Sequence, residues 1–528
     1  MKRILILINL VLGFNLAFAQ TGDPAKYAGL ITTDILQKHL TIIAGKEMEG
    51  RETGTAGQRK AAEYIEKQFK SFGLLPTAAL KGYQQLYPLY QDSLQNTELL
   101  VNGKAAVYGT DYITSLSANE TGSFKGKKYI FVGYGIDDSA YTDYAGMDVK
   151  GKIVVFFLGE PKKDGKYFLR KGGTGTSEWT FPGLSKKLAA AAARGAAGAL
   201  YINPTQDVFS TRSVESGKKT GVYFPRKTEA VTKVNGAQLS HAFAKALLPN
   251  SFDTLAKICK ANGLYDKQWT SETKGKFSFN FAKARNTIMA SNVLGIIEGT
   301  DKKDEYVFLT GHYDHLGKRD SVIYYGADDD GSGTVAVIAM ANAFAKAAAD
   351  GFRPRRTMVF MTVSGEEKGL WGSEYYSDNP VYPLEKTSVD LNTDMVGRID
   401  TERKTADTMN YLYVIGHDKI SSDLPIINEG VNNKYTKLVF DYKFDDPNDR
   451  NRIYFRSDHY NFARKGVPIL FFYDGMLKAD YHKPTDTVDK ITWDLYAKRV
   501  QMIFHTAWEM ANREEMLKRD TPINMGSR

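Results

Sequence analysis

The chain has 528 residues, with 70 Lys and Arg against 61 Asp and Glu, which gives a formal net charge of +9. Its length exceeds that of one small module and suggests two or three domains. With 42% hydrophobic and 25% charged residues, the composition is that of a globular protein and excludes wholesale disorder. The single cysteine, Cys259, excludes an internal disulfide, a cysteine-rich zinc site and a paired-cysteine redox motif.

The excess of basic residues does not indicate a nucleic-acid partner. The densest basic runs, residues 125–128 and 353–356, are short and lie among acidic residues. Binding to a phosphate backbone requires a clustered stripe or groove of positive charge, and no nucleic-acid-binding motif accompanies these runs. We therefore predict a solvated, mildly basic surface and no nucleic-acid partner.

The first residues have the layout of a secretory signal peptide. Lys2 and Arg3 precede an apolar stretch from Ile4 to Leu16, and the small-x-small site at residues 17–19 comes before Gln20. The apolar stretch is shorter than the roughly 20 residues that a membrane-spanning helix needs. We predict a signal peptide at residues 1–19 and a protein exported to the periplasm or the medium. The mature chain should have no integral membrane segment.

The next part of the chain predicts a first group of helices and then a separate unit. Residues 58–72 place apolar side chains on one helical face, and residues 83–123 are a weakly patterned, polar crossing. Residues 128–135, 152–158 and 196–202 are typical of strands, and residues 185–194 and 235–248 of helices. The predicted domains are residues 20–110 and 281–528, which together form the main domain, and residues 111–280, which form a β-rich domain inserted into it.

From residue 286 onward, short apolar runs alternate with helical patterns. The runs are residues 306–310, 357–363, 389–395, 412–415 and 467–473, and the clearest helical patterns are residues 333–348 and 491–511. This alternation predicts an α/β fold with a mostly parallel, mixed sheet that helices cover on both faces. Ligands of open α/β sheets bind at the carboxyl ends of the strands.

Polar side chains follow several of these predicted strands. His312 and Asp314 follow the first run, Glu366 and Glu367 the second, Asp394 ends the third, and His482 comes in the loop after the last. The acidic run Asp328–Asp330 opens the helix after the first strand. Alone, each group is more typical of a turn or a solvated surface. Their joint occurrence, each at a strand end, predicts that they converge on one site.

Converging carboxylates repel one another unless cations compensate them. Two like charges about 4 Å apart cost about 4 kcal/mol at an effective dielectric constant near 20. With His312, Asp329, Glu367, Asp394 and His482 as ligands, three negative charges would meet two divalent cations. Imidazole and carboxylate ligands suit zinc, and two metals that share a carboxylate lie about 3.5–4 Å apart. The sequence therefore predicts a site for two Zn(II) ions.

These motifs resemble those of a known family. The matching segments are residues 311–314, 326–333, 364–367, 392–395, 456–459 and 481–487, and they are similar to the zinc-dependent exopeptidases with two cocatalytic metals. That family includes aminopeptidases, glutamate carboxypeptidases and the non-catalytic transferrin receptor. The resemblance implies the aminopeptidase-like fold of phosphorylase/hydrolase type. Residues 49–54 are similar to the family's N-terminal segment. Residues 132–135 and 143–152 resemble a protease-associated domain, often inserted into these enzymes.

The resemblance also implies a role for each residue. Asp329 would bridge both metals, with His312 and Asp394 completing one site and Glu367 and His482 the other. Glu366 would be the general base, and Asp314 would orient His312. A hydroxide between the metals would attack the peptide carbonyl after Glu366 takes the proton from water. Asp458 and His459 would support the site.

An exported aminopeptidase that acts on peptides is the leading interpretation. A glutamate-releasing carboxypeptidase remains open, because Arg398 or Arg452 could bind the terminal carboxylate of its substrate. A glutaminyl cyclase usually works with one zinc, which the five-ligand set disfavours. A non-catalytic receptor is disfavoured by the intact ligands and Glu366. Side-chain preference and oligomeric state are left open.

Overall fold

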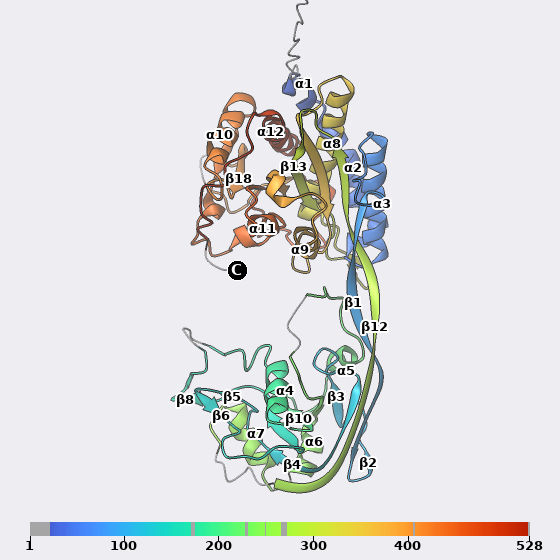
Figure 1. The fold of residues 1–528 in the computed structure, drawn as a ribbon, viewed down its shortest axis with the longest axis vertical. Helices are drawn as coiled ribbons and strands as arrows, with labels where there is room; N and C mark the ends of the chain where they lie inside the picture. Colours follow the sequence, from blue (N-terminus) through green and yellow to red (C-terminus); the bar gives the residue numbers. More distant parts are fainter. Residues whose placement is uncertain are drawn as a thin grey trace, which may run out of the picture. The chain divides into compact units, whose positions relative to one another are not determined.

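The computed structural model describes residues 22–170, 175–226, 231–248, 250–265, 272–404 and 407–525. The predicted signal peptide, residues 1–19, lies outside these residues. The chain divides into two compact units. We call Met1–Tyr87 with Met289–Arg528 the flanking unit, and Pro88–Ile288 the middle unit (Figure 1).

The flanking unit is built on a mixed sheet with a parallel centre. Its strand order is β19 (Val439–Asp441), β18 (Tyr411–Ile415), β20 (Ile469–Tyr473), β17 (Thr387–Thr393), β13 (Lys302–His312), β16 (Arg356–Val363) and β12 (Glu272–Ile297). Strands β16, β13, β17 and β20 are parallel, whereas β12 and β18 pair with this core antiparallel. The predicted α/β class with a mostly parallel sheet is confirmed.

Helices cover both faces of this sheet, because alternate strand residues are apolar on both sides. One face packs Val307 and Leu309 against α1 (Pro24–Ala28), α2 (Thr33–Ile43), α3 (Ala56–Ser71), α8 (Gly333–Ala349), α10 (Asp423–Tyr435) and α12 (Trp493–Asn512). The other face packs Phe308 and Met361 against α9 (Trp371–Asp378) and α11 (His459–Ala463). Every residue of β16 is buried, as the apolar run at 357–363 predicted.

Helix α8 is the apolar centre of the unit. Ala327–Ala349 is long and apolar enough to cross a membrane by length and composition, but 72% of its most apolar window is buried within the protein. Core helices of globular proteins have this composition because they are enclosed on most sides. Among the described residues no other helix meets the same test.

Short elements connect the larger ones and shape the ends of the strands. In the flanking unit they are η1 (Lys46–Arg51), β14 (Lys318–Arg319), β15 (Val322–Ile323), η3 (Ala327–Ser332), η4 (Leu384–Lys386), η5 (Lys443–Asp445), η6 (Ile453–Phe455) and η7 (Val488–Lys490). Arg51, at the end of η1, is fully buried, and its guanidinium donates to the backbone carbonyls of Tyr313 and Gly326. This side chain therefore ties the N-terminal loop to the segments after β13.

The middle unit has its own sheet and core. Its strand order is β12, β4 (Gly122–Phe131), β7 (Ile153–Phe157), β10 (Gly198–Ile202), β11 (Gly236–Leu239) and β3 (Tyr112–Thr114), with β4, β7, β10 and β11 parallel. Helix α4 (Leu184–Ala193) packs on one face, and α6 (His241–Leu247) and α7 (Phe252–Lys260) pack on the other. The remaining elements are β1 (Gln84–Val101), β2 (Lys104–Ala105), β5 (Asp137–Asp138), β6 (Tyr141–Thr142), β8 (Lys162–Lys163), β9 (Lys166–Tyr167) and α5 (Thr211–Lys218).

The observed elements differ from the predicted ones in this part of the chain. Residues 84–101, predicted as a polar crossing, form the strand β1, and the predicted helix 235–248 is strand β11 followed by α6. The middle unit runs from Pro88 to Ile288, wider than the predicted 111–280, because β1 and β12 each continue across a unit boundary. The middle unit's identity as a protease-associated domain stays a prediction.

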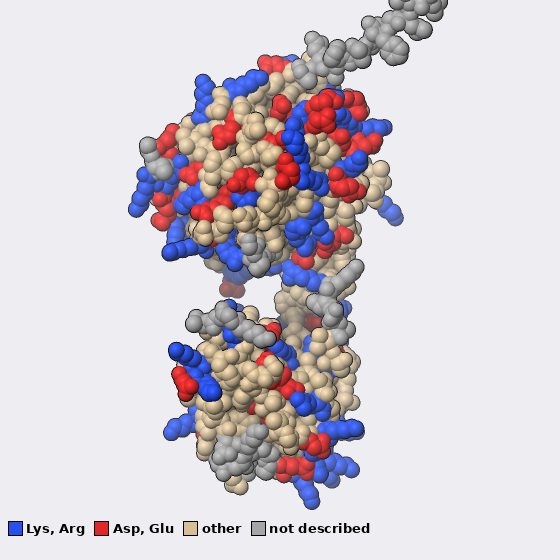
Figure 2. All heavy atoms as spheres, turned by 60° about the vertical axis from the view of Figure 1, so that its left-hand side comes forward, with Lys and Arg blue, Asp and Glu red and all other residues tan. Residues whose placement is uncertain are grey.

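Charges of both signs are mixed on the surface. Figure 2 shows Lys and Arg beside Asp and Glu on each unit in the face that it draws. Exposed ion pairs such as Lys346–Asp350 and Lys245–Asp253 are part of this pattern. Mixed surface charge of this kind is typical of a solvated surface. The absence of a nucleic-acid partner stays a prediction.

Candidate metal centre

The predicted ligands come together at the carboxyl ends of the central strands of the flanking unit. His312 ends β13, Glu367 follows β16, and Asp394 follows β17. Asp329 lies in η3, directly before α8, and His482 lies in the loop after β20. The sheet order places β13 between β16 and β17, so ligands from three neighbouring strands meet at one edge.

Two groups of side chains form around Asp329. In the first, Nε2 of His312 lies 3.3 Å from Oδ1 of Asp329 and 3.6 Å from Oδ1 of Asp394. In the second, Nε2 of His482 lies 3.2 Å from Oδ2 of Asp329 and 3.0 Å from Oε2 of Glu367. Each oxygen of Asp329 thus faces a different group. His312 and Asp394 thus lie on one side of Asp329 and His482 and Glu367 on the other, and their roles as ligands of two metals stay a prediction.

His315 also belongs to the second group, and sequence reasoning assigned it no role. Its Nδ1 lies 2.8 Å from Oε1 of Glu367 and 4.0 Å from Oδ2 of Asp329, and the side chain is fully buried. His315, Asp329 and Glu367 form one of the described clusters whose ligand atoms could hold a metal ion. In the sequence, the indication that His315 belongs to the site was its position three residues after the predicted ligand His312.

The unsatisfied polar atoms of the site fit metal ions. Nε2 of His312, Oδ2 of Asp329 and Oε1 of Glu367 are buried and make no hydrogen bond with any described residue. Buried polar groups without a partner are uncommon in native proteins and require an explanation. Imidazole nitrogens and carboxylate oxygens are ligands that zinc accepts. The residues present therefore fit the predicted metals.

The electrostatics of the site show how much negative charge it carries. Burial works to lower the pKa of His312, but the charges of Asp394 and Glu366 outweigh it and raise that pKa well above its usual range. Burial likewise opposes protonation of His482, yet the adjacent carboxylates of Asp329 and Glu367 raise its pKa to about 10. The carboxylates attract positive charge to this place, and divalent cations would supply it.

Glu366 lies beside the ligands. Its Oε2 is 3.8 Å from Nε2 of His312, and it lines the same pocket as Asp329 and Asp394. Burial raises the pKa of Glu366 well above its usual range, and the charges of Asp394 and Glu367 add to the rise while His312 opposes it. A carboxyl with a raised pKa next to the ligands suits a general base.

The other nitrogen of His312 is held by its neighbours. Nδ1 lies 3.1 Å from the backbone carbonyl oxygen of Asp314 and 3.6 Å from the carboxylate of Asp314. A proton on Nδ1 that is donated to this carbonyl leaves Nε2 free to bind a metal. The carboxylate of Asp314 accepts hydrogen bonds from the Thr53 hydroxyl at 2.6 Å and from the Glu366 backbone N–H at 3.2 Å.

The turn that carries Asp329 is fixed by carboxylates on both sides. The carboxylate of Asp330 accepts from the backbone N–H groups of His312 at 3.0 Å, Gly333 at 2.7 Å and Met395 at 3.0 Å. Asp486 accepts from the backbone N–H of Asp329 at 3.1 Å. Through its three hydrogen bonds, Asp330 connects the segments that carry His312, Asp329 and Asp394. The peptide bond between Asp329 and Asp330 is cis.

Asp458 and His459 lie beneath the site. Nε2 of His459 lies 2.8 Å from the backbone carbonyl oxygen of Tyr454, and its ring stacks on Phe471 with centroids 4.5 Å apart. Burial lowers the pKa of His459 to about 3, so the ring is neutral. The carboxyl of Asp458 accepts from the Ser373 hydroxyl. These contacts agree with the supporting role that the motif implied.

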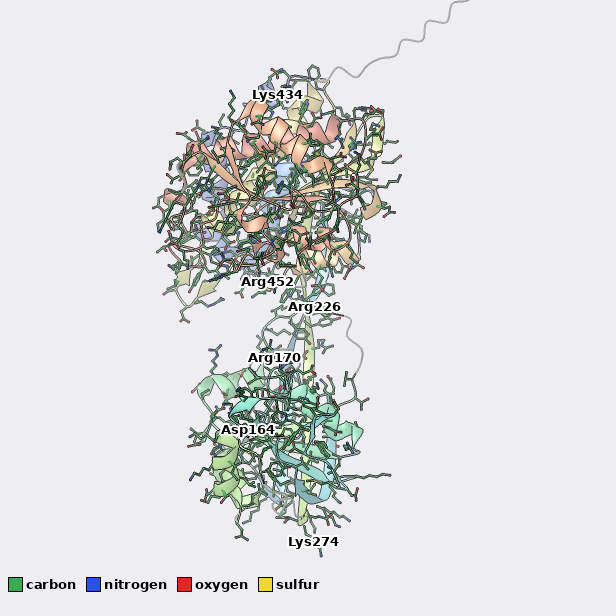
Figure 3. All side chains as sticks on the ribbon, turned by 90° about the vertical axis from the view of Figure 1, so that its left-hand side faces the viewer. Asp164, Arg170, Arg226, Lys274, Lys434 and Arg452 are labelled. Atoms are coloured by element: carbon green, nitrogen blue, oxygen red, sulfur yellow. The ribbon has the colours of Figure 1, made fainter. Side chains whose placement is uncertain are left out.

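The two arginines proposed from the sequence for a substrate carboxylate are engaged elsewhere. Arg398 pairs with Asp480 at 2.7 Å. Arg452 lies at the surface of the flanking unit (Figure 3) and lines a hollow with Asp446 and Phe455. The pocket at the metal centre is instead lined by Arg456.

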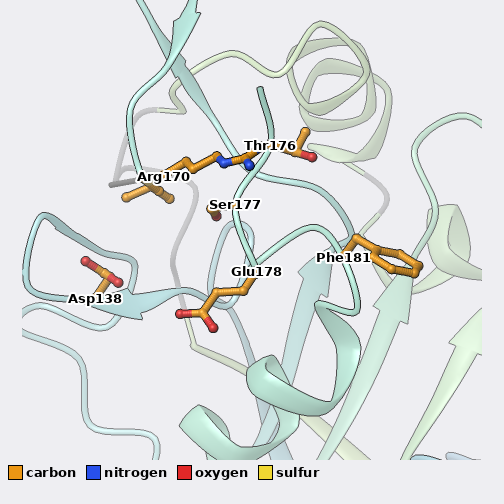
Figure 4. Close-up of a pocket in the computed structure, with 7 residues that line it drawn as sticks. Asp138, Arg170, Thr176, Ser177, Glu178 and Phe181 are labelled. Carbon is orange, nitrogen blue, oxygen red and sulfur yellow. The ribbon is translucent and has the colours of Figure 1, made fainter. Parts of the chain in front are cut away.

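Two other features do not provide a second centre. In the flanking unit, His417, Asp418 and Asp445 form a cluster, but the Lys419 ammonium lies 3.3 Å from Asp445 Oδ1 and already compensates its charge. In the middle unit, a hollow lies between Asp138, Arg170, Glu178 and Phe181 (Figure 4). No described group of potential metal ligands falls in that unit.

This chain is similar to several known proteins. The sequence model of peptidase family M28 matches residues 292–507. A probable leucine aminopeptidase from Trichophyton verrucosum is 26% identical over 261 residues, 47% of this chain and 67% of that protein. A probable zinc metalloprotease from Leptosphaeria maculans is 32% identical over 125 residues, 23% of this chain and 27% of that protein. The solved aminopeptidase from Aneurinibacillus sp. strain AM-1 has 19% identity and a TM-score of 0.48, covering 95% of this chain and 99% of its own.

The family match covers the whole candidate metal centre. All five predicted ligands lie within residues 292–507, as do Glu366 and Asp314. The chain spans about a quarter of the matched metalloprotease and about two thirds of the matched leucine aminopeptidase. The resemblance to the zinc-dependent exopeptidases is confirmed at the level of the family. Residues 292–507 match the sequence model of peptidase family M28, and this part of the chain is therefore similar to the metallopeptidases of that family.

Proposed function

We propose that this protein is an exported aminopeptidase that uses two zinc ions to hydrolyse the N-terminal residue from peptides. The observation that carries the proposal is the arrangement of ligands around Asp329. His312 and Asp394 lie on one side of this carboxylate and His482 and Glu367 on the other. A carboxylate shared in this way is the arrangement expected of a bridging ligand between two metals.

The residues of the chain divide the chemical work. Two zinc ions held by these ligands would acidify a water molecule and polarise the carbonyl of the scissile peptide bond. Glu366 takes the proton from the attacking water and returns it to the leaving amine. Asp314 holds His312 in the orientation that presents Nε2 to the ligand cluster. Thr53 fixes Asp314 in turn.

The alternatives fit the site less well. The predicted Arg398 is already paired with Asp480, so a carboxypeptidase would depend on Arg456, which lines the pocket, to bind the terminal carboxylate. A glutaminyl cyclase with one zinc would leave one of the two ligand groups unexplained. A non-catalytic receptor would have no use for buried ligand atoms without hydrogen bonds. The leucine aminopeptidase named among the relatives supports the aminopeptidase interpretation.

Peptidase assays test this function directly. The purified protein is incubated with leucyl-p-nitroanilide, with the N-acetylated form of this substrate, and with N-acetylated peptides, each with and without a chelator. We expect hydrolysis of the free-amine substrate, none of the acetylated forms, and loss of activity with the chelator that added zinc restores. Release of residues from the C-terminus of blocked peptides would contradict the aminopeptidase proposal and indicate that the enzyme is a carboxypeptidase.

Export is tested separately. The full-length protein is expressed in a bacterium, and the periplasm and the medium are compared with the cytoplasm. We expect the processed protein outside the cytoplasm, with Gln20 as its first residue. A cytoplasmic protein that retains residues 1–19 would contradict export without affecting the enzymatic proposal.

A further inference from the structure

A small, shallow pocket opens onto the candidate metal centre. It is lined by Asp329, Glu366, Asp394, Met395, Ile453, Arg456, Phe471, Tyr473, Leu477 and Tyr481. The three acidic residues of this lining belong to the metal centre. The other walls are apolar or aromatic, with one exception, Arg456. This lining offers apolar contacts and one positively charged group to a ligand that approaches the metal centre.

Arg456 is the positively charged residue of this lining. It follows η6 and precedes Ser457, and its Nη2 donates to the Tyr481 hydroxyl at 2.9 Å. The guanidinium lies 5.7 Å from the centroid of the Tyr481 ring. Among the described residues, no carboxylate forms a direct ion pair with Arg456, and Glu366 acts on its charge from a longer distance. Its remaining N–H donors are free to bind a ligand.

The other arginines near this edge of the sheet have partners. Arg398 pairs with Asp480, and the buried Arg499 donates to the backbone carbonyls of Val396 and Tyr411. Arg51 donates to backbone carbonyls as well. Arg456 differs because its hydrogen bond goes to a neutral hydroxyl, while the carboxylate of Glu366 acts on its charge only from a longer distance. A guanidinium has a planar fork of donors that matches a carboxylate.

Tyr481 connects Arg456 to the metal centre. Its ring stacks on His482 with centroids 3.8 Å apart and planes 19° apart, while its hydroxyl accepts the bond from Arg456. The guanidinium is therefore positioned from the same loop that carries a predicted zinc ligand. A group bound by Arg456 would lie in the pocket together with the reacting peptide.

We propose that Arg456 binds a carboxylate of the peptide substrate and gives the enzyme a preference for acidic substrates. The inference rests on the proposed peptidase function and specifies its substrate class. The carboxylate has two sources: the acidic side chain of the residue in the pocket, or the terminal carboxylate of a dipeptide. Ile453, Phe471 and Leu477 would contact the methylene groups next to it.

Matched substrates separate the charge of the ligand from its size. For the side-chain source, kcat/KM is compared between glutamyl-p-nitroanilide and glutaminyl-p-nitroanilide. For the terminal source, kcat/KM is compared between Leu-Gly and Leu-glycinamide. Each ratio is measured in the wild type, in Arg456→Met and Arg456→Lys, and in Lys478→Met as a control. Lys478 is an exposed cation next to Leu477 in sequence and does not line the pocket.

The ratio of acidic to neutral substrate should exceed one in the wild type for one of the two pairs. We expect Arg456→Met to reduce that ratio about tenfold or more, because a charge-assisted hydrogen bond contributes about 1.5–3 kcal/mol. Arg456→Lys should restore part of it, and Lys478→Met should leave it unchanged. The pair that responds identifies the source of the carboxylate.

Two results would overturn the inference while leaving the peptidase proposal intact. One is a wild-type enzyme that cleaves the neutral member of both pairs as well as the acidic member. The other is an Arg456→Met variant that loses acidic and neutral activity in equal proportion, which would indicate a structural role. No hydrolysis of any substrate by the zinc-loaded wild type would instead contradict the proposed function itself.

Discussion

Three consecutive aspartates at residues 328–330 have three different environments. Asp329 faces His312 and His482, Asp330 accepts three backbone N–H groups, and Asp328 accepts the Gly397 N–H at 2.8 Å. Burial raises the pKa of Asp328 and of Asp330 well above the usual range. Burial acts on Asp329 as well, but the adjacent imidazoles of His312 and His482 outweigh it and hold its pKa well below that range. Asp329 is thus the carboxylate suited to metal binding.

At the same scale, Glu366→Gln tests the general base. The substitution keeps the size of the side chain but removes its ability to accept a proton from water. We expect peptidase activity to fall by about 10²–10⁴-fold while bound zinc is retained, because Glu366 is not a predicted ligand. Steady-state kinetics and elemental analysis measure the two effects. The exposed Glu385→Gln is the control, and wild-type activity in Glu366→Gln would show that another group accepts the proton.

Two buried histidines away from the site make stability depend on pH. Burial lowers the pKa of His39 to about 4 and that of His505 to about 4. Their unfolded pKa is about 6.5, so the unfolded chain binds more protons between pH 4 and 6.5. The free energy of unfolding therefore decreases as the pH falls through this window. Each histidine contributes about 2 kcal/mol of this loss between pH 6.5 and 5.

Urea denaturation at pH 7 and pH 5 checks this expectation. His505→Gln should show a smaller loss of stability between the two pH values than the wild type, by about 2 kcal/mol. The variant also loses the stacking of His505 on Tyr435, which lowers its stability at both pH values and cancels in the difference. An identical pH dependence in the two proteins would mean that His505 titrates normally in the folded state.

At the scale of elements, the N-terminal loop completes the site. The Thr53 hydroxyl donates to Oδ2 of Asp314 at 2.6 Å and accepts from the backbone N–H of Gly365 at 2.9 Å. These bonds connect the loop to the ends of both β13 and β16. The loop at residues 49–54, which resembles the family's N-terminal segment, therefore supports the candidate metal centre through Thr53.

Thr53→Val removes both hydrogen bonds without changing the shape of the side chain much. We expect a loss of about 1–3 kcal/mol in stability and a fall of about 10–100-fold in kcat or zinc affinity, because Asp314 and His312 lose their support. Thr55→Val is the matched control. It removes the N-cap of α3, costs about 1 kcal/mol and should leave kcat at the wild-type value. If Thr53→Val had the same kcat as Thr55→Val, the hydrogen bonds of Thr53 would not contribute to catalysis.

Much of the flanking unit could be predicted from the sequence, because its strands are apolar on both faces. The run 357–363 corresponds to β16, and the run 467–473 contains β20. The location of the candidate site could also be predicted, because the carboxyl ends of parallel strands meet at one edge of the sheet. Strand β1 could not be predicted, since its many polar and partly exposed residues resemble a loop. The part played by His315 depends on a distance to Glu367 that no local pattern contains.

At the scale of the whole molecule, the net charge of the chain and the charge of its candidate site have opposite signs. The chain is basic overall, yet its candidate centre gathers Asp329, Glu366, Glu367 and Asp394 in a buried place. The predicted removal of residues 1–19 would take away Lys2 and Arg3 and leave the acidic residues of the centre in place. The middle unit has its own core and sheet, and the matched family segment does not include it.

The zinc content of the purified protein tests the central claim most directly. Elemental analysis of the wild type and of the variants His312→Ala and His482→Ala gives the number of zinc ions per chain. We predict two in the wild type and a loss of about one in each variant, because each histidine serves one side of Asp329. A zinc-supplemented wild type that binds no zinc, or the same zinc content in all three proteins, would contradict the account.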